Sequence, residues 1–224
     1  SNIVSYVDAL ALKKEQMVKL PVVVYNNHDL NEVIANALSL RSNLEALASE
    51  EEAAGGAYIR PIVLFQAEPK SGSETVTFTR LKDKLVEFGI PKEEIAIKTA
   101  DINELKGVTL ESRDCPIRCI ITINALKEGW DCPFAYVLAT LANRSSPVDV
   151  EQILGRILRQ PYVRQHKKAL LNMSYVLTSS AAFLDALDRI VAGLNRAGFS
   201  KNDYRVKAEQ VAAPASPPPA KERA

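Results

Sequence analysis

The sequence has few of the residues that build metal sites and disulfides. Its 224 residues include three cysteines and two histidines. A structural zinc site needs about four such ligands at characteristic spacings, whereas His28 and His166 lie far from the cysteines in the sequence. An odd number of cysteines in a chain with no secretory signal favours reduced, structural thiols. We therefore predict no metal site and no disulfide.

The chain also lacks long apolar runs and a strong charge of either sign. No run of 18 apolar residues occurs, and no signal-peptide pattern opens the sequence, so we expect a cytoplasmic protein without membrane contact. The net charge of +1 gives no global attraction to nucleic acid, so any such contact must be local. Hydrophobic residues make up 47% and charged residues 25%, as in ordinary soluble domains.

Two catalytic signatures are absent as well. No Gly-x-x-x-x-Gly-Lys-Ser/Thr motif occurs, so the chain has no P-loop to cradle the phosphates of a nucleotide and to place magnesium. Metal-dependent DNA cleavage needs clustered carboxylates and a lysine at adjacent strand ends, and the sequence places no such set there. We therefore rank a nuclease low among the possible functions of this chain.

Strand-like and helix-like segments alternate along most of the chain. Short β-branched apolar runs predict buried parallel strands, and segments with apolar residues every three or four positions predict helices. The predicted strands are 21–25, 62–65, 95–98, 117–123, 135–142 and 169–178, and the predicted helices are 28–54, 75–88, 147–160 and 180–197. This alternation predicts an α/β fold, a parallel sheet with helices on both faces.

Composition divides the chain into three parts. Residues 1–57 hold a strand and a helix that lead into the main lobe, residues 58–205 form that lobe, and residues 206–224 are rich in proline and alanine. The last part cannot bury a core and is predicted to be a disordered, extended linker. The opening Ser-Asn without methionine and this terminal linker indicate a piece of a longer protein.

The segment that starts at Pro147 has the signals of a capped helix. Ser146 is a favourable N-cap, Pro147 suits the first helical position, and Pro161 is expected to end the helix. The apolar residues of the segment fall on one side and should pack on the sheet: Val150, Ile153, Leu154, Ile157 and Leu158.

The other side of this predicted helix carries polar groups. At about 100° per residue, Gln152, Arg156 and Arg159 fall on one stripe, and Gly155 beside them leaves room for a backbone or a phosphate. Guanidinium groups match phosphate oxygens and keep their charge, so the stripe suits a polyphosphate. A solvated surface helix is the alternative interpretation.

A loop with polar residues follows the predicted strand 117–123. In open α/β sheets, ligands bind beyond the carboxyl ends of strands, which is where we expect this loop. Gly129 allows a turn closed to other residues, and Asp131 offers two acceptor oxygens for a sugar hydroxyl. Asp131 could equally be a turn residue that accepts nearby backbone N–H groups.

Three stretches, in this order and spacing, resemble motifs IV, V and six of the Res subunit of Type III restriction enzymes, a branch of the superfamily-two helicases. They read Pro-Ile-Val-Leu-Phe-Gln-Ala-Glu-Pro at 61–69, Ala-Leu-Lys-Glu-Gly-Trp-Asp-Cys-Pro at 125–133 and Glu-Gln-Ile-Leu-Gly-Arg-Ile-Leu-Arg-Gln-Pro at 151–161. The resemblance covers roughly residues 60–200 and implies the second RecA-like motor lobe of such an enzyme, here without a P-loop.

The resemblance also implies roles for the polar residues. Arg156 and Arg159 would be arginine fingers that reach the γ-phosphate of ATP, Asp131 a ribose contact, and Gln152 a nucleotide or nucleic-acid contact. Gly155 and Gly129 belong to the same implied ATP site. ATP and Mg²⁺ would be held mainly by a P-loop lobe of the same polypeptide, so the chain alone is expected to be inactive.

Double-stranded DNA and a modification methyltransferase subunit are the other partners that the resemblance implies. Gln66, Asn124, Lys127 and Arg144 are candidate DNA contacts by location, although each could be a plain surface residue. Relatives of the DEAD-box type carry a threonine eight residues before the aspartate of motif V, whereas this chain has Ile123 there. That departure weakens the assignment of a DNA-phosphate contact at this strand end.

Three other functions stay open at this point. The chain could be a catalytically silent α/β module that docks a partner, because the P-loop is missing. It could be the motor lobe of a Type I restriction or repair helicase. In the resembling family the endonuclease domain lies beyond the motor, past a linker, so cleavage of DNA by this chain ranks last.

Overall fold

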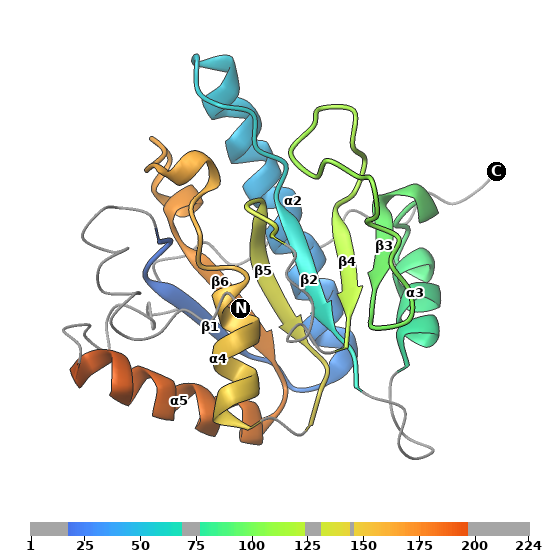
Figure 1. The fold of residues 1–224 in the computed structure, drawn as a ribbon, viewed down its shortest axis with the longest axis vertical. Coiled ribbons are helices and arrows are strands. Elements are labelled where there is room, and N and C mark those ends of the chain that lie inside the picture. The colour runs from blue at the N-terminus through green and yellow to red at the C-terminus, as the bar shows by residue number, and fades with distance from the viewer. Residues whose placement is uncertain (1–17, 69–76, 124–130, 144–145, 197–224) are drawn as a thin grey trace.

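The computed structural model describes residues 18–68, 77–123, 131–143 and 146–196, with side chains to residue 190. These residues form a six-stranded sheet in the order β1-β6-β5-β2-β4-β3, and every pairing between neighbouring strands is parallel (Figure 1). The strands are β1 (Val22–Asn26), β2 (Ile62–Gln66), β3 (Ile95–Lys98), β4 (Cys119–Thr122), β5 (Ala135–Thr140) and β6 (Ser174–Thr178).

Helices cover both faces of this sheet, which confirms the predicted α/β fold. The α-helices are α2 (Leu30–Ala53), α3 (Phe78–Glu87), α4 (Pro147–Gly155) and α5 (Ala181–Arg196). Figure 1 shows α2 behind the sheet, where it packs across β5, β6 and β2, and shows α4 and α5 in front of it, packed on each other. None of the described helices combines the length and the apolar character needed to cross a membrane.

Local sequence signals account for most of the element boundaries. The side chain of Asp29 accepts a hydrogen bond from the Glu32 N–H (2.8 Å) and caps α2, and Thr77 caps α3. Gly89 follows α3 at a φ of +93°, a conformation that side chains disfavour. The central strands β2, β4 and β5 are buried throughout, as expected of strands covered on both faces.

The strand and helix predicted in residues 1–57 are built into the same sheet and layer as the rest. Strand β1 pairs with β6 from Val22 opposite Ser174 to Asn26 opposite Thr178, and α2 carries the chain back to β2. The described residues from Val18 onward therefore share one core with the main lobe.

The predicted strand 169–178 is wrong in its first half. Residues Ala169–Asn172 form a 3₁₀ turn, and β6 begins at Ser174. The hydroxyl of Tyr136 donates to the Leu171 carbonyl (2.8 Å) and so satisfies a buried acceptor that a strand would have paired with a neighbour. The predicted helix 75–88 is found as α3, which begins at Phe78 after the N-cap Thr77. Residues 75 and 76 lie outside the described ranges.

A buried arginine holds the loop that enters β4. Arg60 is almost fully buried, and its guanidinium donates to the carbonyls of Ile117 (2.7 Å), Ser112 (3.0 Å) and Leu110 and to the hydroxyl of Tyr58 (3.0 Å). These carbonyls belong to a segment with little regular structure. The arginine therefore does there what a neighbouring strand does in a sheet.

Replacing Arg60 tests this role. The variant Arg60→Met removes the donors and leaves buried carbonyls unsatisfied, so it should lower the free energy of unfolding by about 2–4 kcal/mol. Urea unfolding measures the change. The exposed Arg80 on α3 is the matched control, and Arg80→Met should change the same quantity by about 0.5 kcal/mol or less. Equal effects of the two variants would contradict the role given to Arg60.

Candidate functional site

Helix α4 begins as the sequence predicts. The Ser146 hydroxyl accepts a hydrogen bond from the Asp149 N–H (3.1 Å) and donates to the Asp149 carboxylate (2.7 Å). Pro147 occupies the first turn, where a missing N–H removes no hydrogen bond. The predicted apolar face is buried, and it comprises Val150, Ile153, Leu154, Ile157 and Leu158.

The end of α4 differs from the prediction. The helix stops at Gly155, so Arg159 lies beyond it and does not share a helical stripe with Gln152. Beyond the helix, the Leu158 carbonyl accepts from the Lys19 N–H (2.6 Å), a donor from the segment before β1. Arg159 itself forms an antiparallel bridge with Val18. These contacts join the segment after α4 to the segment before β1.

Arg156 lies within electrostatic range of Asp131. Arg156 follows the last residue of α4 and is half-buried. Its burial lowers the pKa of the guanidinium, and the charge of Asp131 acts in the opposite direction. The two residues are therefore close enough to interact electrostatically, although they are 25 positions apart in the sequence.

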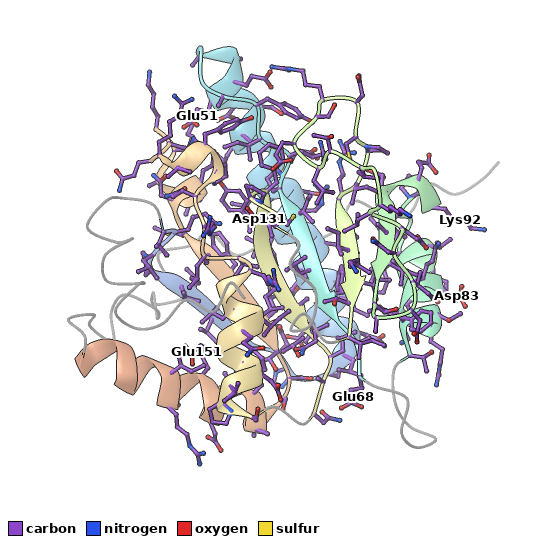
Figure 2. All side chains as sticks on the ribbon, in the orientation of Figure 1. Glu51, Glu68, Asp83, Lys92, Asp131 and Glu151 are labelled. Carbon is purple, nitrogen blue, oxygen red and sulfur yellow. The ribbon has the colours of Figure 1, made fainter. Side chains whose placement is uncertain are left out.

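The location of Asp131 corrects one expectation. The prediction placed its loop beyond the carboxyl end of a strand, but Asp131 lies exposed four residues before Ala135, the first residue of β5. Figure 2 shows Asp131 toward the amino ends of the strands and Glu68, which follows β2, toward the carboxyl ends. The chain has already crossed back along the sheet when it reaches the aspartate.

Gln152 shows an unmet hydrogen-bonding group. Its side-chain carbonyl oxygen is buried and has no hydrogen-bond partner among the described residues, although the residue as a whole is partly exposed. An unsatisfied buried acceptor is costly in a folded protein and calls for a donor. A ligand with an N–H or O–H group fits this oxygen. Gly155 is the last residue of the same helix and is also partly exposed.

Lys19 is a site residue that the sequence analysis missed. It is 0% exposed, its ammonium donates to the Arg159 carbonyl (2.5 Å), and it lies 4.7 Å from the centre of the Tyr136 ring. Burial lowers the pKa of Lys19 to about 7, although the nearby Cys132 and Asp131 act in the opposite direction. The sequence pattern that could have indicated a buried lysine is its place between the apolar residues Val18 and Leu20, directly before a predicted strand.

The DNA-contact candidates are only partly covered by the structure. Gln66 ends β2 and is buried, and its side-chain oxygen accepts from the Thr140 hydroxyl (2.8 Å). It lies at the carboxyl ends of the strands, away from Asp131. The other candidates and one ATP-site residue lie outside the described residues: Asn124, Lys127, Arg144 and Gly129.

All three cysteines, Cys115, Cys119 and Cys132, are buried and free. Burial raises the pKa of both Cys119 and Cys132 to about 12, so neither is a ready thiolate. Within the described ranges, no group of three or more His, Cys, Asp or Glu side chains gathers where it could hold a metal ion.

Comparisons with known proteins give weak likenesses. No protein-family model matches the sequence, and no curated protein matches it. Among solved structures, the C-terminal domain of S. cerevisiae Dbp5 bound to Gle1 is 17% identical with a TM-score of 0.44, over 79% of this chain and 85% of that chain. The Type ISP restriction-modification enzyme LlaBIII bound to DNA is 13% identical with a TM-score of 0.43, over 85% and 14%.

A further likeness is to a fragment of a type I restriction enzyme HsdR subunit from Vibrio vulnificus, at 17% identity and a TM-score of 0.42, over 76% of this chain and 34% of that chain. This chain thus spans well under half of either restriction enzyme structure. Likenesses of this size do not define the activity or the ligands of this chain.

The buried Lys19 should make stability depend on pH. Its pKa is about 7 in the folded protein against an ordinary value of 10.5, so the unfolded chain binds more protons between these values and stability rises with pH. From pH 7 to 8.5, the free energy of unfolding of the wild type should rise relative to Lys19→Met by at most about 1.4 kcal/mol per pH unit. Denaturant titrations at several pH values measure this difference, and parallel curves would contradict the buried, titrating lysine.

Proposed function

We propose that the chain is the second motor lobe of an ATP-dependent DNA helicase or translocase of the Type III restriction kind. The observation that carries this proposal is the convergence of Arg156 with Asp131 at the end of α4. Lys19 links Arg159 to the same residues. Its side chain donates a hydrogen bond to the Arg159 carbonyl, and the charge of Asp131 acts on its pKa. Electrostatic interaction between residues of two distant stretches of the sequence supports the proposal.

The arrangement suits a nucleotide that another lobe holds. The carboxyl end of a helix carries partial negative charge, so α4 itself would not attract a phosphate. Arg156 and Arg159 would supply the positive charge and stabilise the γ-phosphoryl group during its transfer. Asp131 would accept from a ribose hydroxyl, and the unmet oxygen of Gln152 would accept from the nucleotide or nucleic acid. Gly155 and Gly129 would leave room for it.

ATP and Mg²⁺ would be held mainly by a P-loop lobe of the same polypeptide, because this sequence contains no such motif. Double-stranded DNA and a methyltransferase subunit complete the proposed assembly. Gln66, Asn124, Lys127 and Arg144 remain proposed DNA contacts. Gln66 is buried and bonded to Thr140, so a contact between Gln66 and DNA would require its side chain to move.

Substitution of either arginine tests the proposal. In the two-lobe protein, Arg156→Ala and Arg159→Ala should each lower DNA-stimulated ATPase kcat by about 10³- to 10⁵-fold, because fingers of this kind stabilise charge that develops only in transfer. Steady-state phosphate release measures kcat. The exposed Arg189 on α5 is the control, and Arg189→Ala should leave kcat within about twofold.

Each contrary result has a definite meaning. If a P-loop lobe joined to this chain shows no DNA-stimulated ATPase, the chain is instead a silent docking module. If ATPase is present but both arginine variants keep the wild-type kcat, the assignment of Arg156 and Arg159 as arginine fingers is overturned. Cleavage of DNA by this chain with Mg²⁺ alone would place a nuclease within it.

A further inference from the structure

The backbone that carries Arg159 has no helix to hold it. Helix α4 ends at Gly155, and Arg159 is exposed in a short irregular segment. Local turn bonds join the Arg156 N–H to the Ile153 carbonyl (3.1 Å) and the Ile157 N–H to the Leu154 carbonyl (3.0 Å). Other contacts come from elsewhere in the chain: the Lys19 N–H donates to the Leu158 carbonyl (2.6 Å), and the Ser174 hydroxyl lies 3.2 Å from the Ile157 carbonyl. A finger on such a segment needs an anchor at its own peptide.

The side chain of Lys19 supplies that anchor. Its terminal nitrogen donates to the Arg159 carbonyl (2.5 Å). Its backbone carbonyl shares the single proton of the Ser174 hydroxyl with the Ile157 carbonyl and is the nearer of the two acceptors (2.9 Å against 3.2 Å). The residue thus contacts the arginine segment through both its main chain and its side chain. The centre of the Tyr136 ring in β5 lies 4.7 Å from the same nitrogen, so a strand of the sheet helps to position the Lys19 side chain.

A charge at this place is expensive for the fold. Among the described residues, the groups that interact with the Lys19 ammonium belong to Asp131, Cys132, Tyr136 and His166. Only Asp131 among them carries a carboxylate. A buried lysine without full compensation destabilises a domain, and an apolar residue of similar length avoids that loss. Stability alone therefore does not account for a lysine at this position.

We propose that Lys19 is a positioning residue for Arg159, and that its hydrogen bond to the Arg159 carbonyl presents the guanidinium on the face that holds Arg156 and Asp131. This inference rests on the proposed motor function. Lys19 lies outside the three motifs, and it would act on Arg159 through the backbone carbonyl of that residue. Contact with the nucleotide is not part of its role.

The test compares Lys19→Met with a matched buried lysine. Lys98 ends β3, at the edge of the sheet opposite β1, and is 6% exposed against 0% for Lys19, so Lys98→Met controls for the loss of a lysine from a buried position. In the two-lobe protein, Lys19→Met should lower the ATPase kcat by about 10- to 100-fold, since a shift of about 1 Å in a positioned group costs up to about 10² in rate. The KM for ATP should change less than about twofold.

Two further readouts separate positioning from general damage. Lys19→Arg keeps a donor and should recover part of kcat. In an Arg159→Ala background, Lys19→Met should lower kcat by less than about twofold more, because the group that it positions is already gone. In this chain alone, hydrogen exchange at the amides of residues 158–160 should quicken in Lys19→Met and stay unchanged in Lys98→Met.

The outcomes distinguish this proposal from the proposed function. If Arg159→Ala is slow while Lys19→Met keeps wild-type kcat and exchange, the positioning role is overturned and the motor function stands. If Arg159→Ala is as fast as wild type, the finger assignment fails, and with it the catalytic role of Lys19, whatever the exchange shows. Should Lys19→Met fail to fold, Lys19→Gln replaces it: its shorter side chain does not reach the Arg159 carbonyl, so wild-type kcat in that variant overturns the proposal equally.

Discussion

The capture of the α4 end by the segment before β1 is the interaction on which the candidate site depends. Lys19 takes the Leu158 carbonyl with its N–H and the Arg159 carbonyl with its ammonium, and Val18 bridges Arg159. The helix thus fixes Arg156, and the N-terminal segment fixes Arg159.

The parallel sheet separates the site from the other motif residues. All neighbouring strands run the same way, so residues that follow strands gather at one end and residues that precede strands gather at the other. Asp131 precedes β5, and Gln66 ends β2. Successive motifs of the sequence therefore lie at opposite ends of the same sheet.

Buried polar side chains bind the loops near the amino ends of the strands. Arg60 satisfies the carbonyls of the segment before β4, and Lys19 does the same for the segment after α4. Glu51 at the end of α2 accepts from the Lys168 N–H (2.6 Å) and lies 3.5 Å from the His166 ring. Such groups are costly to bury and fix one geometry when satisfied.

The sequence by itself determined the fold class, the order of strands and helices, and the start of α4, because these follow from local properties: β-branched runs, apolar periodicity and the Ser146 cap. It also indicated that Arg156 and Asp131 belong together, through the motif resemblance. The end of α4, the true position of Asp131 and the burial of Lys19 were decided only by the tertiary structure. Each depends on a hydrogen bond or a crossing between segments far apart in the chain, and such long-range partners leave no period or cap in the local sequence.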